Sequence, residues 1–176
     1  MDTSREEKGW MEMEMRQAQH DETMTAINMM KDTALWLKEQ GSTQWADVLE
    51  GSDKHDLKGA VQRGEVYFFL HEEQVVGMAA IWETPTQWDR GLWQTYGFTT
   101  KAYYIHRLIV HPNYRGKGYG TQQLKTIEKN FQRCADELRL DCLSSNSHLI
   151  GFYEANNFVN QGTVGKNNAE KFTLFT

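Results

Sequence analysis

The sequence lacks the features that define several large classes of protein. It has no long apolar run, and its mean hydropathy of −0.69 argues against a transmembrane helix. Its opening stretch, MDTSREEKGWMEMEM, has neither the basic nor the apolar region of a signal peptide. The two cysteines, Cys134 and Cys142, form no CxxC pair, and the six histidines form no HExxH motif. These absences predict a cytoplasmic protein with neither a disulfide framework nor a metal site.

The chain is acidic, with a formal net charge of −5, but its charges are unevenly distributed. Residues 1–56 hold 13 acidic and six basic side chains, whereas residues 101–129 hold one acidic and six basic side chains. An acidic chain does not fit a bulk nucleic-acid binder. The local basic stretch therefore predicts a site for one small anionic ligand.

Length and composition predict one domain that mixes helices and strands. Hydrophobic residues make up 39% of the 176 residues, which suffices for a packed core. We expect a flexible tail over residues 1–10 and a domain over residues 11–176. Apolar patterning predicts strands near 11–17, 65–70, 75–82, 101–110, 138–143, 159–164 and 171–175, and helices near 21–40, 54–62 and 147–156. A further helix follows the glycines at 116–120, with Leu124, Ile127, Phe131 and Cys134 on its apolar face.

Three local features complete this prediction. Asp21 and Ser147 are the expected N-caps of their helices. The polar segment HEEQ, residues 71–74, reads as a hairpin turn. Residues 83–100 are predicted to form an aromatic-rich loop, and a loop of that length in a compact domain is often functional.

The segment LIVHPNYRGKGYGTQQL, residues 108–124, carries the chemistry. A strand leads into Pro112, then into a turn with three glycines, and then into a helix. Such a turn leaves the first amides of the helix uncovered, and these amides and the helix dipole attract an anion. Arg115 and Lys117 add positive charge beside them. The spacing fits neither the P-loop nor the GxGxxG dinucleotide motif, so we expect a phosphate or pyrophosphate in another type of site.

This segment resembles motif A of the GCN5-related N-acetyltransferase (GNAT) superfamily, whose pattern is Arg/Gln-x-x-Gly-x-Gly/Ala. Arg115, Gly118 and Gly120 match that pattern. Residues 138–158, LRLDCLSSNSHLIGFYEANNF, resemble the family's block of strand, Asn, helix and Tyr. Asn157 stands where the family usually has glycine, and asparagine tolerates a left-handed backbone. Residues 34–45 are similar to the first helix and the following loop of many bacterial members.

The resemblance implies an α/β (α+β) fold and an activity. The fold is a single domain with a mixed, mostly antiparallel sheet of about six or seven strands and helices on both faces. The activity is direct transfer of the acetyl group of acetyl-CoA to a primary amine, without a covalent enzyme intermediate. The resemblance also implies three groups of acetyl-CoA-binding residues. The pantetheine pairs with the backbone of Leu108, Ile109 and Val110, where two central strands part, and Asn146 contacts the pantetheine arm. The residues around the pyrophosphate are Arg115, Gly116, Lys117, Gly118, Tyr119 and Gly120.

The chemistry needs one group that accepts a proton from the amine and one that protonates the leaving thiolate. Tyr153, seven residues after Asn146, is positioned as the family's general acid, and a tyrosine hydroxyl is protonated at neutral pH. Asp141 is the first candidate for the base, with Glu83, His106 or a water chain as alternatives. A backbone amide of the strand at 108–110 is the expected oxyanion donor. Cys142 reads as a small buried side chain rather than a nucleophile.

The acceptor is the least determined part of the prediction. The acidic region 1–56 favours a small cationic amine, while a protein N-terminus or lysine is the first alternative. A non-catalytic acyl-CoA sensor is the second alternative, since an intact turn would serve either purpose. We expect no nucleic-acid or membrane partner, and the sequence leaves a homodimer and the range of acyl chains open.

Overall fold

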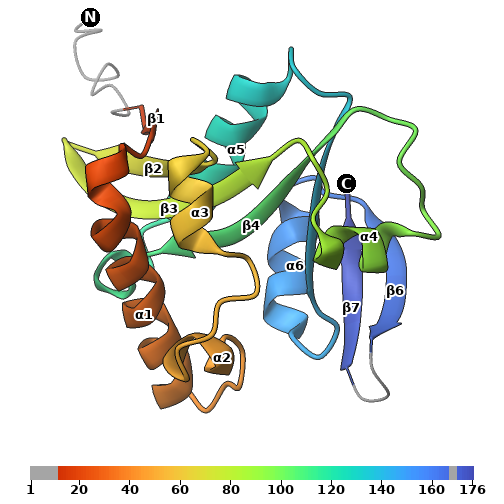
Figure 1. Ribbon diagram of the computed structural model, residues 1–176, viewed down its shortest axis with the longest axis horizontal. Helices are drawn as coiled ribbons and strands as arrows, with labels where there is room; N and C mark the ends of the chain where they lie inside the picture. The colour runs from red at the N-terminus through yellow and green to blue at the C-terminus, as the bar shows by residue number, and fades with distance from the viewer. Residues whose placement is uncertain (1–11, 167–169) are drawn as a thin grey trace, which may run out of the picture. The chain divides into compact units, whose positions relative to one another are not determined.

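The computed structural model describes residues 12–166 and 170–176, so the expected tail at 1–10 lies outside the described residues. Figure 1 shows the elements along the chain. The strands are β1 (Glu14–Gln17), β2 (Val66–His71), β3 (Gln74–Trp82), β4 (Ala102–Val110), β5 (Glu137–Leu143), β6 (Asn160–Lys166) and β7 (Glu170–Phe175). The helices are α1 (Thr23–Glu39), α2 (Ala46–Leu49), α3 (Leu57–Gln62), α4 (Gln87–Trp93), α5 (Tyr119–Phe131) and α6 (Ser147–Ala155), with 3₁₀ turns η1 (His20–Glu22) and η2 (Pro112–Tyr114).

The strands form a seven-stranded sheet in the order β1-β2-β3-β4-β5-β7-β6. Strand β4 pairs with β5 in parallel, whereas β1 with β2, β5 with β7 and β6 with β7 pair antiparallel. This confirms the predicted mixed sheet. In the part of the chain that the structure describes, no helix combines the length and the apolar character needed to cross a membrane.

The described residues divide into two compact units, the first made of residues 12–78 and 109–126 and the second of residues 79–108, 127–166 and 170–176. Strands β3 and β4 and helix α5 each contribute residues to both units. Neither unit is therefore a continuous piece of sequence.

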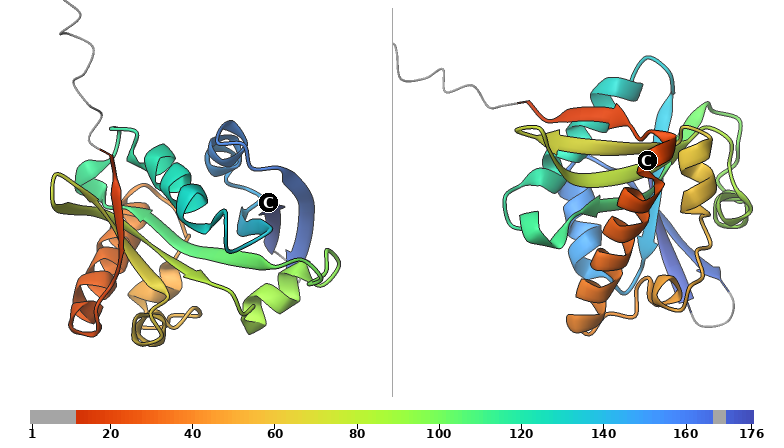
Figure 2. Two further views of the ribbon diagram at one scale, coloured as in Figure 1. Left: turned by 90° about the horizontal axis from the view of Figure 1, so that it is seen from above. Right: turned by 60° about the vertical axis from the view of Figure 1, so that its left-hand side comes forward.

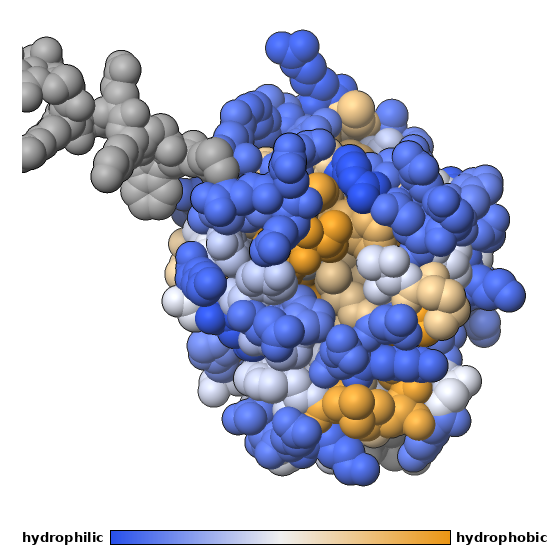
Figure 3. All heavy atoms as spheres, turned by 90° about the vertical axis from the view of Figure 1, so that its left-hand side faces the viewer, coloured by the Kyte–Doolittle hydropathy of each residue, from blue (hydrophilic) through white to orange (hydrophobic). Residues whose placement is uncertain are grey.

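In the first unit, α1 and α3 lie on one face of β1, β2 and β3, and α5 lies on the other face (Figure 2). Helix α1 turns Ala26, Met30 and Ala34 inward at helical spacing, and all three are buried. Strand β2 contributes the buried Phe68 and Phe69. Figure 3 shows a surface on which hydrophilic residues predominate, with apolar side chains visible among them.

In the second unit, strand β7 carries helices on both faces. Successive side chains of a strand point to opposite faces, so Phe172 and Phe175 face opposite sides. Trp88 of α4 packs edge-on against Phe172, while Tyr153 of α6 packs against Phe175. Helices α4 and α6 therefore cover opposite faces of this strand, as the fold prediction requires.

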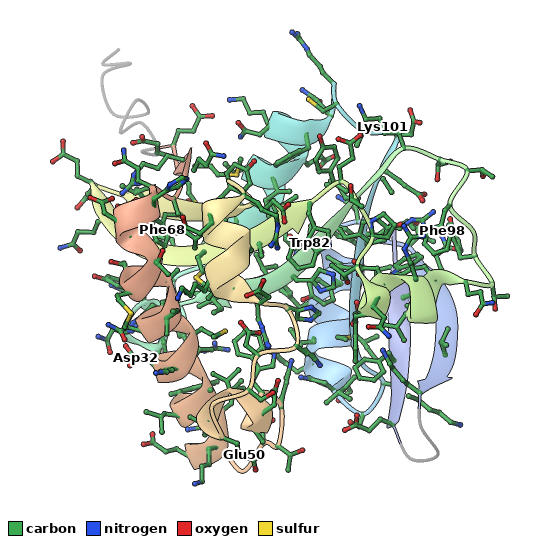
Figure 4. The ribbon with its side chains drawn as sticks, viewed as in Figure 1. Asp32, Glu50, Phe68, Trp82, Phe98 and Lys101 are labelled. Atoms are coloured by element: carbon green, nitrogen blue, oxygen red, sulfur yellow. The ribbon has the colours of Figure 1, made fainter. Side chains whose placement is uncertain are left out.

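The side chain of Arg139 in β5 binds the end of α4 and the segment that follows it. This side chain is buried, and its guanidinium lies within 6 Å of the rings of Trp93, Tyr96, Phe98 and Tyr104. It also donates a hydrogen bond of 2.7 Å to the carbonyl oxygen of Gly97. Figure 4 labels Phe98 in this segment.

The segment 83–100 is not the loop that the sequence predicted, because residues 87–93 form α4. Thr86 caps this helix, since its hydroxyl oxygen accepts a hydrogen bond from the Asp89 amide, and the Asp89 carboxylate accepts one from the Thr86 amide. This reciprocal cap stabilises a helix too short to show an apolar repeat.

Two predicted N-caps are wrong. Asp21 lies inside η1, where Gln19 and Glu22 form a capping box, and Glu22 is the N-cap of α1. The N-cap of α6 is Asn146 rather than Ser147, because the Asn146 side-chain oxygen accepts a hydrogen bond of 3.0 Å from the Leu149 amide.

The two cysteines have different surroundings. Cys142 is buried, as predicted, and burial raises the pKa of its thiol to about 12. Cys134 is exposed and lies beyond the end of α5 at Phe131, so its predicted place on the apolar helical face is wrong.

Candidate functional site

The predicted anion-binding turn connects η2 to α5 in the first unit. Gly116 and Gly118 have φ values of 79° and 77°, which is left-handed backbone that glycine adopts without steric cost. A methyl group added at either position would meet nothing within 4 Å, so the space beside the turn is open. Helix α5 begins at Tyr119, and the first amides of a helix have no acceptor within it. The turn thus offers backbone donors next to open space.

Arg115 is placed by an aromatic ring of α1. Its guanidinium carbon lies 3.9 Å from the ring centre of Trp36, and burial lowers the pKa of this arginine. The ammonium of Lys117 lies 5.9 Å from the ring centre of Tyr114. Tyr119 is buried against the rings of His71 and Tyr114, so its contribution to the predicted binding set is its backbone amide.

The last residues of β4 turn their backbones in alternating directions. The His111 amide donates a hydrogen bond of 2.8 Å to the Val76 carbonyl oxygen of β3. Both backbone groups of one strand residue point to the same edge, and the next residue points to the other edge. Ile109 therefore also faces β3, and its carbonyl oxygen accepts a 2.7 Å hydrogen bond from the Gln123 side chain. Val110 presents its amide and carbonyl to the opposite edge, which is the edge required for pairing with a ligand.

Strands β4 and β5 form the predicted fork within the second unit. The two strands pair over Ala102–Tyr104 and Glu137–Arg139, and both continue beyond these residues. Arg107 has a φ of 48° inside β4, a left-handed conformation of the kind found at β-bulges. The residues beyond Tyr104 and Arg139 consequently line the separation of the two strands.

A cluster of three polar side chains lies at the start of this fork. Continuing the β4–β5 register by two residues places His106 opposite Asp141. One ring nitrogen of His106 and one carboxylate oxygen each of Asp89 and Asp141 all lie within 4.8 Å of one another. Asp89 and His106 are buried, whereas Asp141 is half-buried. We call Asp89, His106 and Asp141 the fork cluster.

Asp89 and His106 form a direct hydrogen-bonded pair. The His106 Nε2 and the Asp89 Oδ1 are 2.6 Å apart. Two ligands of one metal ion at tetrahedral angles would lie roughly 3.3 Å apart, so this spacing is that of a hydrogen bond. Burial acts to raise the pKa of Asp89, but the hydrogen bond and charge of His106 and the hydrogen bonds from Trp82 and Thr86 together outweigh burial and lower this pKa. Asp89 is therefore an ionised acceptor, and the Nε2–H of His106 donates to it.

Tyr153 and Asp141 are on opposite sides of β5. Asp141 and Arg139 share the face that α4 covers, whereas Tyr153 packs on the face that carries Phe175. Burial, with the Cys142 and Asp141 charges as smaller causes, raises the pKa of Tyr153 well above its ordinary range. The Tyr153 hydroxyl thus stays protonated at physiological pH, as a general acid requires.

Two other predicted residues have structural contacts. The Asn146 side-chain oxygen caps α6, so the cap uses one of the two polar atoms predicted to meet the pantetheine arm. The Glu83 carboxylate pairs with Lys101 at 3.7 Å and is exposed. Glu83 also lies 3.5 Å from the Tyr103 hydroxyl, and Tyr103 is on the face of β4 opposite His106. Glu83 is therefore the weaker candidate for a base.

The sequence analysis missed Asp89 and Trp82. Trp82, labelled in Figure 4, stacks on the His106 ring with centroids 4.6 Å apart and donates a 2.9 Å hydrogen bond from its indole to Asp89. Asp89 and His106 are 17 positions apart, so no local motif connects them. The spacing of Thr86 and Asp89 at a helix start was the one available signal.

Comparison with known proteins identifies the class. The model of the acetyltransferase (GNAT) family matches residues 26–158. The "Uncharacterized N-acetyltransferase YesJ" of Bacillus subtilis (strain 168) is 31% identical over 137 residues, which are 77% of this chain and 76% of that protein. The chain therefore belongs to the GNAT family and is an acetyl-CoA-dependent acyltransferase.

Solved structures agree with this assignment. A GNAT-family acetyltransferase from Listeria monocytogenes is 35% identical, with a TM-score of 0.75 and coverage of 93% of this chain and 92% of that one. RimL, described as a ribosomal L7/L12 alpha-N-protein acetyltransferase in complex with coenzyme A, has a TM-score of 0.63 at 17% identity, with coverage of 93% and 92%. At that identity, the likeness to RimL shows a shared fold.

Proposed function

We propose that this protein transfers the acetyl group of acetyl-CoA directly to the primary amine of a small cationic acceptor, and that residues 11–176 act as one catalytic domain. The observation that carries the proposal is the turn before α5, which joins two left-handed glycines, open space and the uncovered amides of a helix start. The fork cluster, with two carboxylates, supplies the negative charge that suits a cationic acceptor.

The residues present fit acetyl-CoA as the second substrate. The backbone amides from Gly116 to Gly120 would hold the pyrophosphate, with Arg115 and Lys117 adding charge. Leu108 and Val110 would pair with the pantetheine. The carbonyl oxygen of Ile109 instead accepts a hydrogen bond from the Gln123 side chain, which supports the strand on its other edge. The amide of Val110 is the proposed oxyanion donor. Asn146 would contact the pantetheine arm through its side-chain amide group.

Catalysis would use opposite faces of β5. Tyr153 protonates the leaving thiolate from the α6 side. Asp141, on the other face, meets the incoming amine. An acceptor and a thioester held next to each other would gain much of the rate from orientation.

The alternatives differ in the acceptor or in turnover. A protein N-terminus or lysine is the first alternative, and RimL, which shares the fold, is described as a protein acetyltransferase. A non-catalytic acyl-CoA sensor is the second. A homodimer and a cytoplasmic location also remain predictions of the sequence, and light scattering in solution would test the former.

Isothermal titration with acetyl-CoA, CoA and ATP tests the binding step. We expect tight binding of acetyl-CoA and CoA and much weaker binding of ATP. Gly118→Ala, which places a side chain in left-handed backbone, should weaken acetyl-CoA binding about tenfold. Gly51→Ala is the matched control, because Gly51 has a φ of 83° and open space but lies outside the turn. Equal losses in both variants would contradict the assigned turn.

Release of free CoA thiol from acetyl-CoA tests turnover. The acceptor panel contains spermidine, an aminoglycoside, lysine, a peptide with a free N-terminus and a lysine peptide with an acetylated N-terminus. We expect the highest kcat/KM with a small polycation. A preference for either peptide would support the first alternative, and binding without turnover would support the sensor.

A further inference from the structure

We propose that His106, oriented by Asp89, is the catalytic residue that accepts the proton of the acceptor ammonium, and that Asp141 holds this ammonium beside it. The inference rests on the proposed function, because it assigns the base and the acceptor anchor of that reaction.

The Asp89 carboxylate is held in place by hydrogen bonds and in turn fixes the orientation of the His106 ring. Its Oδ2 accepts hydrogen bonds of 2.9 Å from the indole of Trp82 and from the amide and hydroxyl of Thr86. Its Oδ1 is the partner of His106 at 2.6 Å. The Asp89 side chain has no exposed surface, so its position is fixed from all sides. Asp89 is thus a positioning residue that acts through His106.

The orientation determines which nitrogen of His106 reacts. Because the Nε2–H donates to an ionised carboxylate, the neutral ring carries its proton on Nε2. Nδ1 is then the basic nitrogen. Trp82 stacks on the ring at an interplanar angle of 22° and restricts its rotation.

The location fits the incoming amine. His106 and Asp141 lie two residues beyond Tyr104 and Arg139, the last paired residues of β4 and β5. They therefore line the same face of the fork, opposite to the face of Tyr153. The proposed proton acceptor and proton donor therefore approach the fork from opposite faces of β5.

The surrounding charges favour a cationic acceptor. The carboxylates of Asp89 from α4 and Asp141 from β5 face His106. Arg139, on the same face of β5, is paired with Glu137 and hydrogen-bonded to the Tyr104 hydroxyl. The Tyr104 hydroxyl, whose pKa burial raises, lies on the same face as His106, Arg107 follows His106 on β4, and Tyr153 of α6 is influenced by the Asp141 charge.

The proton transfers balance across the reaction. Nδ1 of His106 takes one proton from the ammonium, and the freed amine nitrogen forms a bond to the acetyl carbon. The carbon–sulfur bond breaks, and the thiolate takes the hydroxyl proton of Tyr153. The second proton that the nitrogen loses as the amide forms restores Tyr153, and His106 passes its proton to solvent.

The first test compares wild type, His106→Gln and Asp89→Asn over a range of pH, with the best acceptor from the panel. In wild type, kcat should fall at acidic pH. His106→Gln should lower kcat at neutral pH about 100-fold and leave acetyl-CoA affinity unchanged. The deficit should shrink as pH approaches the pKa of the acceptor amine, because the amine then arrives already deprotonated.

A matched substitution controls for the loss of a histidine. His20→Gln, at an exposed position in η1, should leave kcat and its pH profile unchanged. Circular dichroism melts check that every variant is folded. A His106→Gln deficit that stays constant with pH, or no deficit, would overturn the assignment of the base.

A second measurement does not depend on activity. Nitrogen-15 NMR of labelled histidines should show the Nε2-protonated tautomer for His106, identified by its absence in His106→Gln. Asp89→Asn should change that tautomer balance. An Nδ1–H tautomer in wild type would overturn the inference, while a failed acceptor panel with the expected tautomer would count against the proposed function instead.

Asp141 has its own test. Asp141→Asn should raise the KM of the acceptor at least tenfold and change kcat less. An unchanged acceptor KM would contradict the role of Asp141 as the ammonium anchor.

Discussion

Individual side chains in this protein acquire their chemical character from their neighbours. Tyr153 and Cys142 are ordinary side chains whose pKa values rise because they are buried. Glu22 shows the opposite effect, because Arg16 donates to both of its carboxylate oxygens at 2.8 Å and holds its pKa at about 2.

Replacing Tyr153 with phenylalanine isolates the hydroxyl. The ring contacts with Phe175 and Phe158 can remain, so we expect little change in stability. kcat should fall about 100-fold with acetyl-CoA affinity unchanged. Because the pKa of Tyr153 is raised, wild-type kcat should not decline on the alkaline side below about pH 10. An alkaline decline near pH 8 that disappears in Tyr153→Phe would contradict this assignment.

The Arg16–Glu22 pair predicts a pH-dependent contribution to stability. Glu22 titrates at about 2 when folded and near 4.5 ordinarily, so the pair stabilises the fold above about pH 4.5 and loses its effect as pH falls through 2. Glu22→Gln should lower the free energy of unfolding by about 1 kcal/mol at pH 7. Urea titrations at pH 7 and pH 2.5 measure this, and an undiminished difference at pH 2.5 would contradict the prediction.

Among the secondary-structure elements, the end of β4 is supported by β3 and α5 together. Gln123 is fully buried, and its side-chain Nε2 donates a hydrogen bond to the Ile109 carbonyl oxygen beside Gly77 of β3. A methyl group at position 77 would overlap both partners, so this glycine permits a close approach.

Gly77→Ala should therefore disturb the strand as well as its stability. We expect a loss of about 3 kcal/mol in the free energy of unfolding, from overpacking and the broken hydrogen bond. Acetyl-CoA affinity should also fall, because the backbone at 109–110 would shift. Gly165→Ala, at a strand position with open space, is the control. Urea denaturation and acetyl-CoA titration of both variants are the measurements. Losses in Gly77→Ala alone indicate local overpacking, whereas equal losses in Gly165→Ala would indicate a general effect of replacing glycine.

The elements also show what a sequence can reveal. The strands and the longer helices followed from apolar patterning, and the turn at 71–74 appears as Glu72 and Glu73 with φ values of 50° and 65°. The left-handed conformation expected at Asn157 is also present, with a φ of 68°. Helix α2 was missed because four residues are too few for a helical repeat, and α4 was missed because its start depends on the reciprocal cap of Thr86 and Asp89.

The site was only partly predictable for a related reason. The glycine turn is contiguous in sequence, so its spacing was informative. The pairing of Asp89 with His106 arises only when α4 packs against β4, and no motif connects the two residues in sequence. Asn146 was assigned to a ligand, and its capping role depends on where α6 begins.

At the scale of the whole molecule, strands β3 and β4 and helix α5 belong to both compact units. Shared elements couple the stability of one unit to that of the other. We therefore expect a single unfolding transition rather than two.

Acetyl-CoA should stabilise the whole chain. At a concentration 100-fold above its Kd, a ligand that binds only the folded state adds about 2.7 kcal/mol. For a chain of this length, that corresponds to a rise of roughly 5–10 °C in Tm. Differential scanning calorimetry with and without acetyl-CoA measures this. Two separate transitions, or a shift confined to part of the unfolding enthalpy, would contradict the coupling.

The stacking of Trp82 on His106 has an optical consequence. An imidazolium ring in contact with an indole quenches its fluorescence, whereas a neutral imidazole does so much less. The emission of Trp82 should therefore depend on the ring at position 106, and it should differ between wild type and His106→Gln. The protein thus contains an intrinsic fluorophore that reports on its proposed base without any added label.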